Sequence, residues 1–421
     1  MGTRPADGVA AVEAVWRIEA ARLVAGLARF TGDLGTAEEL AQDALVVALE
    51  QWPVRGIPAN PGGWLMSTAK NRAVDGFRRT AVHRRALTTL GRTADDAVDP
   101  GDTIEDALDD PVRDDTLRLL FTACHPALNR EYRVALVLRC LGGLSTVEIA
   151  RGFLVAESVA GQRISRAKRT LRDKGVRFEL PTAAELPDRL ATVLDVIYLV
   201  FNEGYSATAG SDWMRPALGT EALRLARLTA ALLPTEPEAH GLAALLELTQ
   251  ARAPARTDRD GHPVLLQHQD RSRWDRLLIR RGLAALARAR AGGVVGPYTL
   301  QAAVAACHAS APTAADTDWT RIAGLYDLLV TAWPNPVVAL NRAMAHGHAF
   351  GGDAGLRLLD DLDDAALPDY PHLPAVRGEL LAMAGRHAEA VPAFEAAAGL
   401  TGNEQERLLF TERAERARAL G

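Results

Sequence analysis

Apolar residues recur at intervals of three, four and seven positions along most of the chain. In residues 9–30 this stripe consists of Val12, Val15, Trp16, Leu23, Leu27 and Phe30. The spacing is that of an α-helix with one buried face, and the alternation typical of strands is scarce. Similar patterns predict helices over residues 36–52, with Glu38 and Glu39 in the first turn, and over residues 64–79. We therefore expect a helical bundle at the start of the chain.

Residues 144–172 carry the most specific local pattern. Ser145 can cap a helix, and Glu148 three residues later completes a capping box. After a short turn, a second helix is predicted over residues 158–172. Its expected core positions are Val159, Ile164, Ala167 and Leu171. Because arginine and glutamine on the other faces can reach base edges and phosphates, the pattern favours a helix-turn-helix that binds a major groove. The alternative is a helical hairpin with a solvated basic face.

The remaining segments differ sharply in character. Residues 94–115 contain ten acidic residues and a single arginine, which indicates a solvated linker between two basic segments. The long C-terminal part is rich in alanine and leucine, and prolines punctuate its predicted helix pairs. Two of its segments, near Pro336 and Pro374, resemble each other about 36 residues apart, close to the tetratricopeptide period of about 34. This predicts an array of helical repeats.

Composition limits the possible functions. Of 421 residues, 48% are hydrophobic and 24% charged, as in soluble globular proteins. Since 48 cationic residues face 53 acidic ones, the net charge of −5 gives no overall attraction to nucleic acid, and any such surface must be local. Three cysteines without a CxxC pair, and no signal peptide or membrane span, predict a cytoplasmic protein that does not bind membranes.

No pattern indicates an enzyme. Cys124 and His125 are adjacent and would point in different directions on a helix, and no further ligand has suitable spacing. We expect a buried thiol there. The segment 258–261 departs from a calcium loop in the position of its glycine and is better explained as a surface turn. We therefore expect no catalytic residues, no metal site and no cofactor.

Two segments of the N-terminal bundle resemble a known family. Residues 63–79, GWLMSTAKNRAVDGFRR, resemble the promoter-melting helix of the sigma-70 family, extracytoplasmic-function (ECF) type. Residues 37–49, AEELAQDALVVAL, resemble that family's helix for docking on the polymerase beta-prime clamp. The docking motif comes first and the helix-turn-helix last, as in the family, and the resemblance covers about residues 10–178. The C-terminal half is similar to a subgroup with a tetratricopeptide-like extension.

The resemblance implies an all-α protein of four parts. These are sigma region 2 (1–86), an acidic linker (87–115), sigma region 4 (116–180) and a TPR-like helical extension (181–421). It implies a transcription initiation factor that binds the beta-prime clamp and beta flap of core RNA polymerase and directs it to promoter DNA. It also implies that the extension regulates this activity, through a protein or ligand partner that the sequence does not identify.

The residues expected to act follow from the matching segments. The polymerase-binding residues are Glu38, Glu39, Gln42 and Asp43. The residues expected at the minus-ten element are Lys70, Asn71, Arg72, Asp75, Arg78 and Arg79. Their cations suit the phosphates of an opened strand, and Asn71 offers both a donor and an acceptor to a base. The residues expected at the minus-thirty-five element are Gln162, Arg163, Ser165, Arg166 and Arg169.

Two alternatives stay open at this point, and so does the role of one cluster. The chain could be a ligand-sensing helix-turn-helix regulator, which binds operators without polymerase, or a TPR-like scaffold without promoter-dependent activity. In the extension, an aromatic and polar cluster does not follow a core periodicity. It could form an interaction surface or close interfaces between helices. This cluster consists of Tyr198, Asn202, Glu203 and Tyr205.

Overall fold

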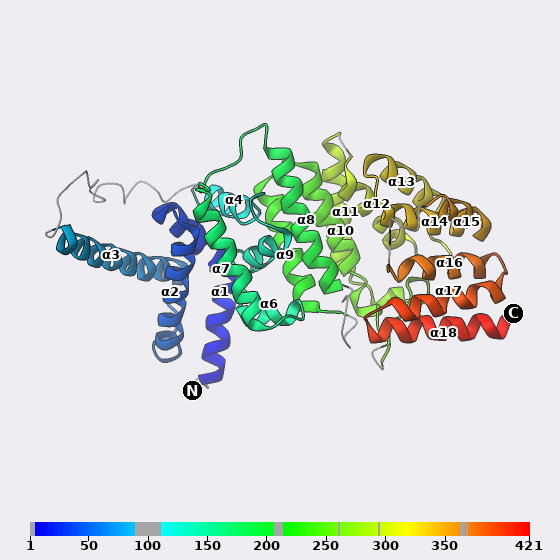
Figure 1. Cartoon of the computed structure of the whole chain (residues 1–421), viewed down its shortest axis with the longest axis horizontal. Helices are drawn as coiled ribbons and strands as arrows, with labels where there is room; N and C mark the ends of the chain where they lie inside the picture. Colours follow the sequence, from blue (N-terminus) through cyan, green and yellow to red (C-terminus); the bar gives the residue numbers. More distant parts are fainter. Residues whose placement is uncertain are drawn as a thin grey trace. The chain divides into compact units, whose positions relative to one another are not determined.

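The computed structural model describes residues 5–88, 111–205, 214–259, 262–293, 295–362, 367 and 369–421. Within these ranges the regular elements are helices, and Thr257 and Pro263 form an isolated β-bridge (Figure 1). The prediction of an all-α fold is confirmed. The chain divides into two compact units, Met1–Val196 and Ile197–Gly421, and the division falls within helix α8.

The first unit contains the predicted bundle and the helix-turn-helix. Its helices are α1 (Pro5–Thr31), α2 (Leu34–Arg55), α3 (Pro61–Thr88), α4 (Pro111–Ala123), α5 (Arg130–Cys140), α6 (Thr146–Gly152), α7 (Glu157–Asp173) and the beginning of α8 (Leu186–Tyr205). Helix α1 packs against α2, α3 and α4. Most of its apolar stripe is buried, with Trp16 at 5% and Leu27 at 0% exposure, because several helices cover it. At its end, Phe30 is 39% exposed, contrary to the prediction.

Helix α2 begins earlier than the sequence predicted. Asp33 is its N-cap, and the carboxylate accepts a hydrogen bond from the Thr36 backbone N–H at 2.7 Å. The helix therefore starts at Leu34, and Glu38 lies beyond its first turn, contrary to the expectation of a dipole contact. At the other end, the helix continues through Pro53 to Arg55 and stops at Gly56, whose φ of 85° favours glycine.

The helix-turn-helix forms largely as predicted. The capping box is confirmed: Glu148 Oε2 accepts from the Ser145 N–H at 2.8 Å, and Ser145 Oγ accepts from the Glu148 N–H at 3.2 Å. One expected core position in α7 is wrong. Val159 is 37% exposed and its neighbour Ala160 faces inward instead. The other three predicted positions, Ile164, Ala167 and Leu171, are buried.

The second unit is a series of packed helices. They are the end of α8, α9 (Pro216–Leu232), α10 (Pro237–Gln250), α11 (Arg276–Ala291), α12 (Pro297–Ser310), α13 (Trp319–Ala332), α14 (Pro336–Phe350), α15 (Gly352–Asp360), α16 (His372–Met383), α17 (His387–Leu400) and α18 (Glu404–Leu420). Short 3₁₀ turns at Ala253–Ala255, Leu266–His268 and Arg271–Arg273 lie between α10 and α11. Consecutive helices contact one another along most of this series.

One apolar core runs through the last helices of the second unit. It joins buried residues of α14 to α18, including Leu380 at 0% and Phe394 at 2% exposure. Figure 1 shows α16, α17 and α18 side by side. Gly378 permits this approach, because a Cβ there would lie 2.9 Å from the Phe394 ring. The predicted helical array is present, with small residues where its helices cross.

Candidate nucleic-acid and polymerase interface

Helix α7 presents one exposed polar stripe. Gln162, Ser165, Arg166 and Arg169 are spaced i, i+3, i+4 and i+7, and all four are exposed. In the described part of the chain, neither Arg166 nor Arg169 has an ion-pair partner. The predicted minus-thirty-five residues thus lie together on one helix face, apart from Arg163.

Arg163 points toward helix α5. Its Nη2 lies 2.9 Å from Glu131 Oε2 in the first turn of α5, and its side chain is 23% exposed. The partner carboxylate is 59% exposed, so this pair is open to competition by solvent and by phosphate. Arg163 must therefore leave Glu131 before it can bind DNA, whereas Arg166 has no ion pair to break among the described residues.

A third group on α7 faces the first bundle. Lys168 Nζ lies 2.6 Å from Glu38 Oε2, and Arg172 makes two bonds to Asp33, at 3.0 and 3.1 Å. We call these four residues the α2–α7 junction. Arg172 lies beside Gly35, where a Cβ would come within 2.8 Å of its guanidinium. The cations of the recognition helix are thus divided between an exposed stripe and an intramolecular contact.

Glu38 is the centre of this contact. It is 4% exposed, and its second oxygen accepts a hydrogen bond from Arg139 Nε of α5 at 2.7 Å. Burial acts to raise the pKa of Glu38, but the charges of Arg139 and Lys168 outweigh this and hold the pKa below its usual value. Glu38 is therefore a paired, ionised carboxylate, and it is not displayed for an external partner in this conformation.

The other predicted polymerase-binding residues lie on the outer side of α2. Glu39 and Asp43 are exposed and Gln42 is half-buried. Val46, one turn further on, is a large apolar residue with 50% exposure. Asp43 also pairs with Arg72 of α3 at 3.1 Å, so it joins the two predicted sites of region 2. Both partners of that pair are exposed, and its energetic contribution is small.

Helix α3 displays part of the predicted minus-ten site. Lys70 Nζ lies 5.9 Å from the centre of the Phe30 ring, and Asn71 is exposed. The side chains of Asp75, Arg78 and Arg79 lie outside the described residues. Trp64 packs edge-to-face on buried Trp52, with ring centres 5.2 Å apart.

Two contacts from α1 to the helix-turn-helix were not foreseen. The Trp16 indole donates to the Gly143 carbonyl at 3.1 Å, and Arg17 Nη2 lies 2.5 Å from Glu148 Oε1. Gly143 has a φ of 65°, and a Cβ there would lie 3.2 Å from Ala20. These partners are separated by 127 and 131 positions, so no local pattern could have revealed them.

The aromatic cluster of the extension is largely engaged within the second unit. Tyr198 donates to Gln301 Oε1 at 3.2 Å and packs edge-to-face on Tyr298. Glu203 pairs with Arg215. The Arg256 guanidinium stacks on the Tyr205 ring at 3.5 Å, while Asn202 is exposed. Three of the four side chains thus close helix interfaces.

Signs of metal or thiol chemistry are lacking where the structure permits a search. Cys124 is 1% exposed, and burial raises its pKa to about 12. No cluster of three metal-ligating side chains occurs among the described residues. Nor does any helix in those ranges combine the length and apolarity needed to cross a bilayer.

Known protein families match both the N-terminal bundle and the helix-turn-helix. Residues 18–83 match the family model of sigma-70 region 2, and residues 118–171 match that of sigma-70 region 4. Residues 189–290 match a family of unknown function (DUF6596). No solved structure matches the chain.

Relatives of the chain fall into two groups. An uncharacterized protein of Rhizobium meliloti, R00370, is 42% identical over 381 residues, which cover 90% of this chain and 89% of that protein. The ECF RNA polymerase sigma factor SigL of Mycobacterium tuberculosis is 30% identical over 145 residues, 34% of this chain and 77% of SigL. The probable ECF sigma factor SigI of the same species is 29% identical over 177 residues, 41% of this chain and 58% of SigI.

The helix-turn-helix, the preceding bundle and the order of the two define a transcription initiation factor of the sigma-70 class. The chain belongs to the ECF RNA polymerase sigma factors.

Proposed function

We propose that this chain binds core RNA polymerase through the outer face of α2 and places α3 on the minus-ten element and α7 on the minus-thirty-five element. The observation that supports this most is the exposed stripe of Gln162, Ser165, Arg166 and Arg169. A recognition helix needs such a face, because arginine binds guanine edges in the major groove with two parallel hydrogen bonds.

The minus-ten contact requires no covalent chemistry. Opening a duplex requires about 1.4 kcal/mol per base-pair step, which contacts to the opened strand must offset. Lys70 and Arg72 supply cations for its phosphates, and exposed Asn71 supplies a donor and an acceptor for a base. The unpaired bases would thus be held by α3.

The α2–α7 junction must open for both DNA elements to be bound at once. The minus-ten and minus-thirty-five positions lie about 25 base pairs apart, roughly 85 Å along the duplex at 3.4 Å per pair. Glu38 and Lys168 are only 2.6 Å apart. The linker predicted to end at residue 115 ends earlier, because α4 begins at Pro111 and Asp115, 4% exposed, pairs with Arg29 and Arg118. The chain between α3 and α4, residues 89–110, has an extended length of roughly 75 Å, of the same order as the separation required. We infer that the described conformation is a closed state.

Polymerase itself is suited to open this state. Glu38 belongs to the segment that resembles the clamp-docking helix, yet its carboxylate is held by Arg139 and Lys168. Polymerase can approach first through exposed Glu39 and Asp43, and then compete for Glu38. Opening would free Lys168 and Arg172 for DNA phosphates, so polymerase binding and promoter binding would be coupled.

The test is transcription in vitro by core polymerase and the full chain from a library of genomic promoters. We expect specific transcripts, and we expect Arg166→Ala to reduce them while Arg280→Ala, at an exposed arginine of α11, leaves them unchanged. Tight operator binding without any transcript would instead support the ligand-sensing regulator. Absence of both DNA binding and transcripts would support the scaffold.

We further propose that the C-terminal extension regulates this activity. A chain that ends at Tyr205 keeps α8 whole and removes the rest of the second unit. If the extension is regulatory, this chain should differ from the full chain in polymerase affinity or in transcript yield. Equal values for both chains would contradict a regulatory role.

A further inference from the structure

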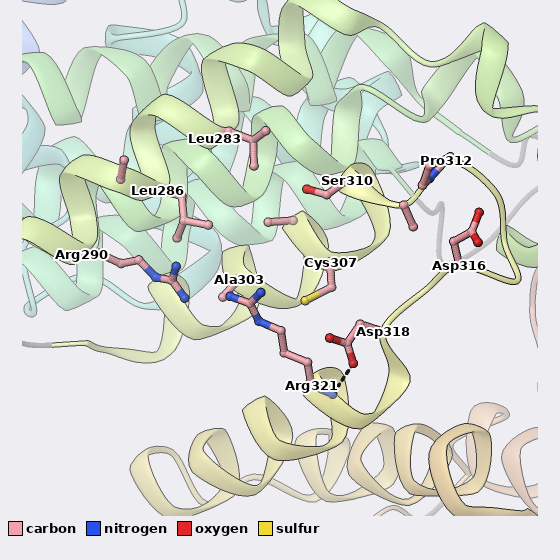
Figure 2. Close-up of a pocket in the computed structure, with 13 residues that line it drawn as sticks. Leu283, Leu286, Arg290, Ala303, Cys307, Ser310, Pro312, Asp316, Asp318 and Arg321 are labelled. Atoms are coloured by element: carbon pink, nitrogen blue, oxygen red, sulfur yellow. Dashed lines mark hydrogen bonds between the residues drawn. The ribbon is translucent and has the colours of Figure 1, made fainter.

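A cavity of about 380 Å³ lies in the second unit where α11, α12 and the start of α13 meet (Figure 2). Its volume falls within the range of small-molecule sites. Leu283, Leu286 and Ala287 line it from α11, and Ala303, Ala306 and Cys307 from α12. Most of this lining is apolar, and Leu283 is 36% exposed. The cavity therefore offers an apolar wall to a solute.

Two arginines reach the same part of this wall. Arg290, at the end of α11, and Arg321, in the first turn of α13, both line the cavity, and both are exposed. Figure 2 shows their side chains pointing toward one another. Within the described ranges, neither guanidinium has a hydrogen bond or an ion pair. Because both side chains are exposed, water and salt screen much of their mutual repulsion, and an anion bound between them would offset the rest.

The acidic residues of the cavity do not supply that anion. Asp318 is the N-cap of α13, and its carboxylate accepts from the Arg321 backbone N–H at 2.9 Å. Asp316 accepts from the N–H and hydroxyl of Thr313 at 3.1 and 2.7 Å. In Figure 2, Asp316 lies at the far end of the cavity from Arg290. Both acids line the cavity, but their hydrogen bonds hold the connecting turn, and among the described residues neither forms an ion pair with Arg290 or Arg321.

We propose that this cavity binds a small organic anion, with its carboxylate or phosphate between Arg290 and Arg321 and its apolar body against α11 and α12. Guanidinium groups suit this role, because their paired N–H donors match the oxygens of both anions. A bound anion would contact three helices at once and stabilise their packing. The proposal does not depend on the activity in transcription.

Cys307 provides a built-in reporter of occupancy. It lines the cavity and is half-buried, whereas Cys124 and Cys140, the other two cysteines of the chain, are 1% and 0% exposed. Burial also raises the pKa of Cys307, but it raises the pKa of the two fully buried thiols to about 12, which suppresses their reactivity further. Alkylation of the native full chain by N-ethylmaleimide should therefore report on Cys307.

The experiment compares alkylation rates with four probes. Octanoate and monooctyl phosphate carry both an anionic group and an apolar chain, octanol carries only the chain, and octyltrimethylammonium carries the opposite charge. We expect the two anions to slow alkylation of Cys307 and to bind measurably by calorimetry, and the other two to do neither. The tighter of the two anions identifies the preferred head group.

Variants test the role of the arginines. Arg290→Gln and Arg321→Gln should each weaken binding of octanoate about tenfold, since each removes a charge-assisted hydrogen bond. The control is Arg288→Gln, at an exposed arginine of the same helix that does not line the cavity. Rates are compared with and without probe within each variant, because the arginines also affect the thiol. Equal protection by octanol, unchanged affinity in both variants, or no protection by any probe would overturn the proposal.

Discussion

The α2–α7 junction and the core of α14 to α18 hold helices together by different physical means. The junction is ionic: Glu38 and Asp33 on one side meet Lys168 and Arg172 on the other. The C-terminal core is apolar and continuous, with Leu359, Leu380 and Phe394 almost fully buried. When helices separate, the charged groups of an ion pair can form new contacts with a nucleic acid or another protein. The apolar side chains of a core can only become exposed to water.

The difference indicates which part of the chain is suited to rearrange. Exchange of an ionic partner retains most of the electrostatic energy, because phosphates or carboxylates of a partner replace those of the chain. Separation of α16 from α17 would expose apolar surface at about 25 cal/mol per Å². We therefore expect the first unit to open and the C-terminal core to stay intact, and the following predictions test this comparison.

The largest effect is expected for Phe394→Ala. The ring is 2% exposed and packs on Gly378, so its removal leaves a cavity that the neighbouring helices cannot fill. The free energy of unfolding of the second unit should fall by about 3–5 kcal/mol in a denaturant titration. Leu408→Ala, at a 52% exposed position of α18, is the control and should change it little. Equal effects of the two would mean that Phe394 is not part of a packed core.

Glu38→Gln should have the next largest effect, and on conformation rather than on unfolding. The change leaves Arg139 and Lys168, which are 17% and 14% exposed, without their carboxylate. The closed state should lose about 2 kcal/mol. Dyes on exposed Glu50 of α2 and Asp173 of α7 should then report a larger mean separation by energy transfer. Polymerase affinity of the variant should also be measured, because Glu38 pairs within the chain in the closed state and is proposed to bind polymerase in the open state. Unchanged transfer, matching that of the exposed-site control Glu13→Gln, would show that Glu38 does not hold the junction.

Arg166→Ala should weaken binding of the polymerase complex to its promoter by about 1–3 kcal/mol, if the guanidinium reads a guanine. The matched variant Arg163→Ala should cost less, because Arg163 must first leave Glu131. Fluorescence anisotropy with matched and altered minus-thirty-five sequences measures both. An equal loss on every sequence would assign Arg166 to phosphate contact instead.

Ser145→Ala should lower the free energy of unfolding of the first unit by about 1 kcal/mol, because the hydroxyl caps α6. Chemical denaturation monitored by circular dichroism measures the change. Thr192→Ala is a suitable control, since its hydroxyl bonds to the carbonyl of Asp188 within α8 and caps no helix. A loss no greater than that of the control would contradict the role of the capping box.

The smallest effect concerns acid. Burial acts to raise the pKa of Asp33, but hydrogen bonds from Arg172 and Thr36 lower it from 3.8 to about 2. Because the folded pKa is the lower one, this stabilisation is fully present above pH 3.8 and is lost as pH falls toward 2. Energy transfer across the junction should thus be constant from neutral pH down to about pH 5 and decline below about pH 4. Arg172→Gln should shift the decline to higher pH, and an unshifted decline would exclude Asp33 as its cause.

Local sequence patterns were sufficient to predict most of the helices and the family. Periods of three and four residues gave the helices, and Ser145 with Glu148 gave the capping box, because each depends on neighbours within one turn. The buried positions of α7 also followed from its helical period, except that Ala160 is buried in place of Val159. The order of docking segment and helix-turn-helix was sufficient to indicate a sigma factor.

The partners of charged residues of the same type depend instead on the packing of distant helices. Glu38 and Glu39 are neighbours in sequence, yet Glu38 is 4% exposed and bonds to Arg139 and Lys168. Glu39 is 74% exposed and lies 3.9 Å from Lys168. Arg290 and Arg321 likewise lie on separate helices, and only the packing of those helices makes both line one cavity of the second unit. A helical period fixes the direction of a side chain within its own helix, but the partner it meets depends on which distant helix packs there.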